Sequence, residues 1–140
     1  MSTQPRGRLK FDRIEEKSDD AGLWMEVSLT QGGRMVVGRS PSVEAGESRD
    51  GIRRAALATL DAIETFVDRE FSCDLQEVDR VHALGKELVV LLINLKFEGR
   101  QIQLFGSCRA GEEVREAAAK AALDATNRYI DIVLNKRSDD

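Results

Sequence analysis

Apolar and polar residues alternate through Leu23–Thr30, and this is the clearest strand pattern in the chain. The apolar set is Leu23, Met25, Val27 and Leu29. A period of two over eight residues predicts a strand with one buried face. Gln31–Arg34 (QGGR) predicts a tight hairpin turn, because paired glycines tolerate positive φ, and Met35–Gly38 opens the returning strand. A short strand is expected before them in Arg8–Glu16, followed by the polar turn Lys17–Gly22.

A polar loop, Arg39–Asp50, follows the predicted hairpin. Loops of about a dozen residues in compact domains are typically mobile or functional. Ile52–Val67 then has apolar residues at helical spacing, namely Ile52, Ala56, Leu60, Ile63 and Val67. We expect Ser48 or Asp50 to cap this helix. The first half of the chain is therefore predicted to form three strands and a helix.

The second half predicts the same order of elements. They are a strand in Asp74–Leu84, a turn at Gly85–Lys86, a strand in Leu88–Phe97, a turn at Glu98–Arg100, a strand in Ile102–Gly106, a loop at Ser107–Gly111 and a helix in Glu112–Leu134. The Leu88–Phe97 strand is rich enough in aliphatic residues to be buried on both faces. Alanines crowd the helix from Ala117 to Ala125 and permit very close packing against a neighbouring element.

The sequence also repeats itself. Val27–Arg34 (VSLTQGGR) returns 66 residues later as Ile93–Arg100 (INLKFEGR), and Arg54–Leu57 matches Lys120–Leu123 at the same offset. We therefore predict an α+β fold in which a βββα unit is duplicated within one domain, residues 1–140. The repeats span about 8–70 and 74–136, with loose ends at 1–7 and 135–140. Each antiparallel sheet carries a helix on one face, and pseudo-twofold packing of the units buries the alanine-rich stripes.

Composition limits the possible partners. Of the 140 residues, 41% are hydrophobic and 33% charged, with a net charge of −4. An even, mildly acidic balance argues against a nucleic-acid-binding protein, which usually needs a clustered basic face. No apolar stretch reaches the ~18 residues of a membrane helix, and the first ten residues lack the apolar core of a signal peptide. We expect a cytoplasmic protein without nucleic-acid or membrane partners.

Catalytic chemistry has few candidates. Cys73 and Cys108 lack CxxC spacing and are expected to be packed thiols, although Cys108, which precedes a helix, could be an activated thiolate. His82 could act as a general base near neutral pH, but no nucleophile or orienting carboxylate accompanies it in the sequence. With a single histidine in the chain, a zinc site would need unusual help from carboxylates. We expect no metal, no cofactor and no catalytic residues.

Several segments of the second half resemble the C-terminal regulatory, or dimerisation, domain of 2-isopropylmalate synthase and citramalate synthase. Asp79–Leu84 is similar to the family's strand ending in V-H-A-L, and Val89–Arg100 to its hairpin ending in G-R. Gly106–Ala118 resembles its G-x-G-x-S-x-D-I-V-E-A-S loop and helix start, with Cys108 at the second glycine and Ala110 at the serine. The TIM-barrel catalytic domain that precedes this module in the family has no counterpart in these 140 residues.

The resemblance implies two βββα copies, a homodimer and an amino-acid-like effector bound between the units. It does not imply an enzyme. The residues that would bind such an effector lie where each third strand meets its loop, namely Gly38, Arg39, Ser40, Gly106, Ser107 and Arg109. Arg39 and Arg109 could hold a carboxylate bidentately, and the loop before the second helix could hold an anion through backbone N–H groups. Solvated arginines and a plain loop are the alternative.

Three functions remain open from the sequence. The first is a non-catalytic regulatory or dimerisation module that binds a small amino-acid-like ligand. The second is an adaptor that binds another protein through a sheet edge or an alanine-rich helix face. The third is a small enzyme that uses Cys108 or His82.

Overall fold

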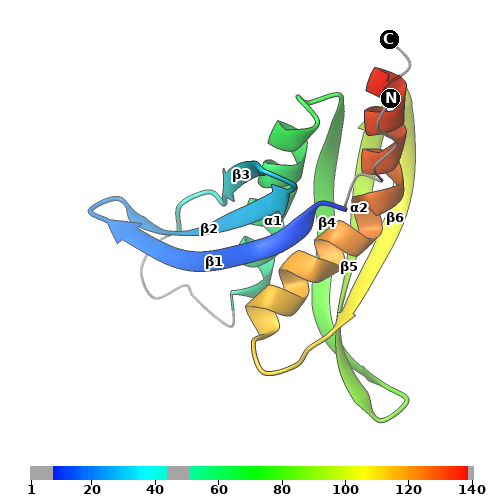
Figure 1. The fold of residues 1–140 in the computed structure, drawn as a ribbon. Coiled ribbons are helices and arrows are strands. Elements are labelled where there is room, and N and C mark those ends of the chain that lie inside the picture. Colours follow the sequence, from blue (N-terminus) through cyan, green and yellow to red (C-terminus); the bar gives the residue numbers. More distant parts are fainter. Residues whose placement is uncertain (1–7, 44–50, 139–140) are drawn as a thin grey trace.

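Two antiparallel sheets and two helices make up residues 8–43 and 51–138, which the computed structural model describes (Figure 1). The elements are β1 (Lys10–Asp19), β2 (Gly22–Gln31), β3 (Arg34–Arg39), α1 (Ile52–Phe66), β4 (Phe71–Ala83), β5 (Lys86–Phe97), β6 (Arg100–Arg109) and α2 (Val114–Ser138). One sheet has the order β1-β2-β3 and the other β4-β5-β6. The predicted α+β class is confirmed.

The alternating pattern of β2 faces the core as predicted. Met25, Val27 and Leu29 have no exposed surface. β1 extends to Asp19, further than predicted, and the turn contracts to Asp20 and Ala21. The reversal is this tight because the Asp19 carboxylate accepts the N–H of Ala21 at 2.7 Å, the local bond that favours aspartate in turns.

The prediction that the β5 strand is buried on both faces is wrong. Val89, Leu91, Ile93 and Leu95 are buried, whereas Leu88, Val90 and Leu92, which alternate with them, are only half-buried. Both helices contact this sheet, α2 through β5 and β6 and α1 through β4, and Figure 1 shows them on the same face of it. The aliphatic residues of β5 on the opposite, outer face therefore belong to the molecular surface.

The loop predicted at Ser107–Gly111 is also partly wrong, because β6 continues to Arg109. Ser107, Cys108 and Arg109 pair with Val90, Val89 and Leu88. The longer β5 supplies these partners, and the N–H of Ala110 still bonds to the Glu87 carbonyl at 2.9 Å. Ser107 and Arg109, predicted to bind a ligand from a loop, thus lie in a strand.

The helices lie between the two sheets and pack on each other. α1 packs on β2 and β3, and α2 packs on β5 and β6. Alanines dominate the contact and are buried, namely Ala55, Ala56, Ala58, Ala62, Ala117, Ala118, Ala121, Ala122 and Ala125. Small side chains allow this close approach of helix to helix and helix to sheet. The predicted burial of the alanine-rich stripes is confirmed within a single chain.

Residues 135–138, part of the segment predicted to be loose, form the last turn of α2, and 139–140 lie outside the described residues. The Arg137 guanidinium donates to the Val67 carbonyl at 2.8 Å and lies 3.0 Å from the Asp68 carboxylate. It also lies 3.2 Å from Glu70. Arg137 therefore fastens the last turn of α2 to the connection between α1 and β4.

The predicted cap of α1 by Ser48 or Asp50 falls in residues 44–50, outside the described ranges. Gly51 occupies the N-cap position with φ 79° and makes no side-chain bond. This left-handed conformation favours glycine, which has no Cβ. The predicted loose end 1–7 is likewise outside the described residues.

Candidate functional site

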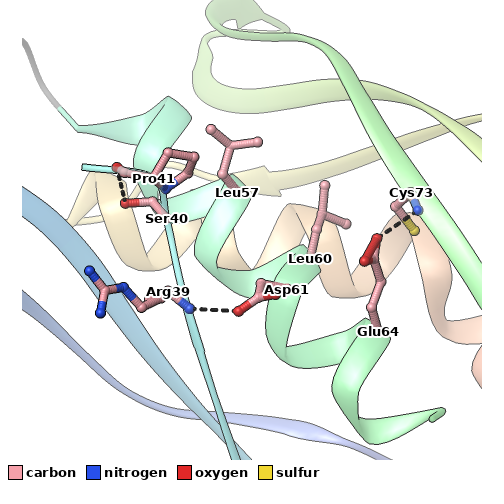
Figure 2. Close-up of a pocket in the computed structure, with 8 residues that line it drawn as sticks. All are labelled: Arg39, Ser40, Pro41, Leu57, Leu60, Asp61, Glu64 and Cys73. Carbon is pink, nitrogen blue, oxygen red and sulfur yellow. Dashed lines mark hydrogen bonds between the residues drawn. The ribbon is translucent and has the colours of Figure 1, made fainter. Parts of the chain in front are cut away.

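An open depression of about 420 Å³ lies where the end of β3, α1 and the start of β4 meet (Figure 2). Its apolar wall consists of Pro41, Leu57 and Leu60, and its polar wall of Asp61 and Glu64. Arg39, Ser40 and Cys73 complete the lining. A volume of this size suits a small metabolite, and the depression contains two of the predicted ligand-binding residues.

The polar wall carries an excess of negative charge. Asp61 and Glu64 project from successive turns of α1, and one guanidinium, that of Arg69, lies 3.7 Å from Asp61 and 3.0 Å from Glu64. Each carboxylate also accepts a backbone N–H, Asp61 from Arg39 at 2.9 Å and Glu64 from Cys73 at 2.8 Å. Two carboxylates that share one cation favour a positively charged group in the depression.

The side chain of Arg39 points away from this depression. Its guanidinium carbon lies 4.4 Å from the centre of the Trp24 ring on the outer face of the sheet, and Figure 2 shows it directed away from α1. The stack is a cation–π contact. The predicted role of Arg39 as a bidentate carboxylate ligand would require it to leave Trp24. Trp24 accordingly lies on the sheet surface rather than in the core.

Ser40 serves the fold. It is 1% exposed, its hydroxyl accepts the Met25 N–H at 2.9 Å, and its own N–H donates to the Met25 carbonyl at 2.9 Å. The hydroxyl donates in turn to the Pro41 carbonyl at 3.3 Å. Both bonds to Met25 close the end of the β2–β3 hairpin. Ser40 therefore shapes the depression and leaves no free hydroxyl for a ligand.

Gly38 and Gly106 are packing residues where a helix meets a strand. A Cβ on Gly38 would lie 2.2 Å from the Ala58 carbonyl oxygen, and a Cβ on Gly106 would lie 2.0 Å from that of Ala121. Contacts below 3 Å with backbone atoms leave no room for any side chain. The helix backbone fills the space beside each glycine, so neither faces a cavity.

Ser107 and Arg109 are exposed on β6, and neither lines the depression beside Arg39. The N–H of Ser107 donates to the Asp124 carboxylate at 3.0 Å, and Arg109 pairs with Leu88 in the ladder. A second depression, of about 490 Å³, lies beside Asp124 and is lined by Arg8, Asp124, Asn127, Arg128, Asp131, Ile132 and Asn135. Neither depression contains residues of both predicted loops.

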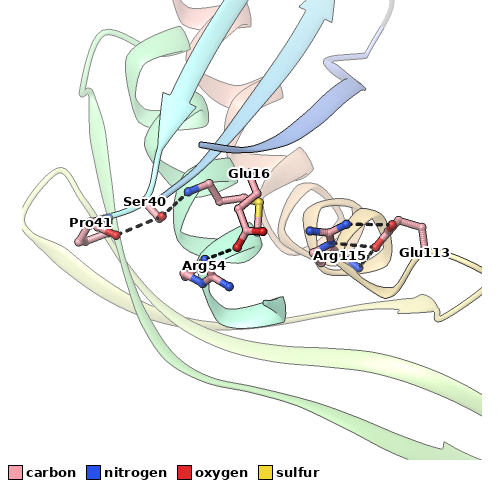
Figure 3. Close-up of polar contacts among 7 residues, drawn as sticks. Glu16, Ser40, Pro41, Arg54, Glu113 and Arg115 are labelled. Carbon is pink, nitrogen blue, oxygen red and sulfur yellow. Dashed lines mark hydrogen bonds and ion pairs between the residues drawn. The ribbon is translucent and has the colours of Figure 1, made fainter. Parts of the chain in front are cut away.

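A cluster of charges lies near the first turns of both helices (Figure 3). Arg54, 8% exposed on α1, is 3.0 Å from Glu16 of β1. Arg115, at the start of α2, donates through Nε to Glu113 at 3.0 Å, and these bonds hold the pKa of the Glu113 carboxyl below its usual value. Each cation has its own carboxylate, so the cluster is electrically balanced and ties β1 to α1.

The thiols have the environment of packed residues. Burial, with the Glu64 carboxylate second, raises the pKa of the Cys73 thiol to about 12. Burial also raises the pKa of Cys108. Nucleophilic cysteines need a lowered pKa. Within residues 8–43 and 51–138 no three His, Cys, Asp or Glu side chains are grouped to hold a metal ion, and His82 is exposed beside Glu87 at 3.9 Å.

Asp61, Glu64 and Asp124 were not predicted from the sequence as site residues. The sequence nevertheless contains a pattern that could have identified Asp61 and Asp124. Leu60-Asp61-Ala62 recurs as Leu123-Asp124-Ala125. In both halves the aspartate accepts the N–H that follows the packed glycine, from Arg39 and from Ser107. In the fold, Asp61 of α1 corresponds to Asp124 of α2. The sequence repeat, which aligns Arg54–Leu57 with Lys120–Leu123, is therefore shifted from this structural correspondence by about one helical turn.

No protein-family model matches this chain, and no curated protein matches it. Among the described helices, none combines the length and apolarity needed to cross a membrane.

Proposed function

We propose that this chain is a non-catalytic regulatory module that binds a small amino-acid-like molecule in the depression between β3 and α1. The observation that carries the proposal is the pairing of a carboxylate wall, Asp61 and Glu64, with an apolar wall, Leu57 and Leu60. An ammonium group would complement the carboxylates, and an aliphatic side chain would cover the leucines. The resemblance to a regulatory domain of amino-acid biosynthesis supports the same ligand class.

The proposal includes a duplicated origin of the two βββα halves, related by a pseudo-twofold axis. Its support is an arrangement that recurs in both halves: a glycine packs against the helix backbone, and the next residue's backbone N–H donates to an aspartate of that helix. We also propose, as the sequence predicted, that the protein is a cytoplasmic homodimer without nucleic-acid partners. The raised thiol pKa values support a role without nucleophilic catalysis.

Thermal denaturation with a matched ligand panel tests the binding site. We expect leucine and 3-methylbutylamine, which carry an ammonium group, to raise Tm, and 4-methylpentanoate, which lacks one, to leave it unchanged. A ligand at ten times its Kd stabilises the fold by about 1.4 kcal/mol, which corresponds to a shift of about 4 °C. The panel should include other branched-chain amino acids and keto acids.

The variant D61N/E64Q removes the negative charge and retains oxygen acceptors for the two backbone N–H groups. We expect it to abolish the shift, while Asp124→Asn, the matching change in the second half, retains it. A shift that survives in D61N/E64Q would place the ligand elsewhere. No shift with any compound at millimolar concentration would contradict ligand binding and favour an adaptor that uses a sheet edge, because the alanine-rich helix faces are buried within the chain.

A further inference from the structure

The four edge strands of the two sheets differ in their protection against pairing with another chain. β1 and β4 are rich in charge and interrupted by irregularities between Phe11 and Arg13 and between Leu75 and Glu77. β3 is only six residues long. Charge, bulges and short length are the usual devices that prevent edge-to-edge association.

β6 has none of these devices. It is ten residues long, its pairing with β5 is continuous, and Gln101–Cys108 contains no charged residue or proline. Figure 1 shows β6 at the edge of its sheet, and within the described ranges its only sheet neighbour is β5. Phe105 is 74% exposed on the outer face. An edge of this kind is a template for strand addition.

Asp124 limits how far such pairing can extend. Its bond from the Ser107 N–H shows that the N–H groups of odd-numbered residues in β6 point to the free edge, because N–H direction alternates along a strand. The N–H groups of Gln101, Gln103 and Phe105 therefore point outward. The N–H of Ser107 already donates to Asp124 and cannot pair with a new strand, which restricts such a strand to about residues 100–106.

We propose that a second copy of this chain occupies this edge, by antiparallel pairing of β6 with β6 about a twofold axis at Gln103. In this register Gln101 lies opposite Phe105 of the second copy, Arg100 lies opposite Gly106, and no like charges face each other. The two sheets join into one of six strands. The inference rests on the homodimer part of the proposed function and is independent of the ligand.

The position of α2 fits the same arrangement. α2 packs over β5 and β6. The proposed twofold axis beside β6 therefore lies about one strand spacing from α2, and the α2 helices of the two copies would be ~10 Å apart. The carboxylate of Asp124 lies at the free edge of β6. Arg128 and Asp131, four and seven residues further along α2, lie on the same side of the helix as Asp124. These three exposed residues alternate in sign, and an antiparallel copy can therefore place Arg128 beside an aspartate.

Introducing a charge at Gln103 tests this geometry. Light scattering on the full chain should give twice the 15.6 kDa chain mass. Gln103→Lys and Gln103→Glu each place two like charges opposite each other at the axis, and we expect either to raise the dimer Kd at least about tenfold. An equimolar mixture of the two should form a dimer again, because lysine then faces glutamate.

Met35→Lys is the matched control, since Met35 stands three residues before Gly38 as Gln103 stands before Gly106, and it is 56% exposed. We expect it to remain dimeric. Circular dichroism would verify that every variant is folded. A monomeric wild type would overturn the homodimer itself. A wild-type dimer that persists in both Gln103 variants, or a mixture that stays monomeric, would overturn the β6 interface alone.

Discussion

Gly106 of β6 lies directly against the backbone of Ala121 in α2, so closely that a Cβ on the glycine would be 2.0 Å from the Ala121 carbonyl oxygen. Gly38 has the same relation to Ala58 in α1, at 2.2 Å. The strand and the helix of each half thus meet without an intervening side chain. This contact sets the distance between each helix and its sheet, because the opposing atoms belong to backbone and cannot rotate away.

Gly106→Ala should therefore destabilise the fold. Overpacking a tight contact typically costs 1–3 kcal/mol and occasionally more, and we expect about 3 kcal/mol here because only a backbone shift relieves the clash. Urea denaturation gives the free energy of unfolding. Gly33→Ala is the control, since a Cβ there meets nothing within 4 Å, and its effect should stay within about 0.5 kcal/mol. Equal effects of the two changes would contradict the packing role of Gly106.

Cys73 should make stability fall at high pH. Its folded pKa, raised mainly by burial to about 12, exceeds the ordinary value of 9.0. Its stabilising contribution is complete below pH 9 and is lost between pH 9 and 12, because the unfolded chain then releases a proton that the folded chain keeps. From pH 8 to pH 10 the free energy of unfolding should fall by about 1 kcal/mol more than in Cys73→Ala.

The comparison between wild type and Cys73→Ala removes the contributions of other titrating groups. Alkylation supplies a second measurement. At pH 8 the folded protein should react with iodoacetamide at Cys108 before Cys73, because burial raises the pKa of the Cys73 thiol to about 12. Identical pH profiles for the two proteins, together with rapid alkylation of Cys73, would show that this thiol is not held protonated.

Arg137→Ala should destabilise the fold by about 1–2 kcal/mol. The change removes the bond from the guanidinium to the Val67 carbonyl, at 2.8 Å, and the contacts with Asp68 and Glu70. Hydrogen bonds that involve a charged group contribute about 1.5–3 kcal/mol, reduced here by partial exposure of the side chain. Chemical denaturation measures the loss.

Lys136→Ala is the neighbouring control. Lys136 pairs with Glu98 at 2.7 Å, but both side chains are more than half exposed. Exposed pairs contribute little, so we expect a change within about 0.5 kcal/mol. A larger loss for Lys136→Ala than for Arg137→Ala would show that the guanidinium does not fasten the end of α2.

The local order of the elements followed from the sequence because it depends on patterns a few residues long. Alternation in β2, helical spacing in α1 and the glycine turns specify strand, helix and reversal through contacts between near neighbours. The recurrence of VSLTQGGR as INLKFEGR indicated that the second half would follow the same order.

Only the tertiary structure decided what those residues do. The glycines expected to cradle a ligand pack against helix backbone, Ser40 bonds to Met25, and Arg39 stacks on Trp24. The carboxylates of Asp61 and Glu64 line one depression because α1 lies beside the end of β3 and the start of β4. The extent of β6 was likewise set by its long partner β5. Such outcomes depend on contacts between residues far apart in the chain, which no local pattern records.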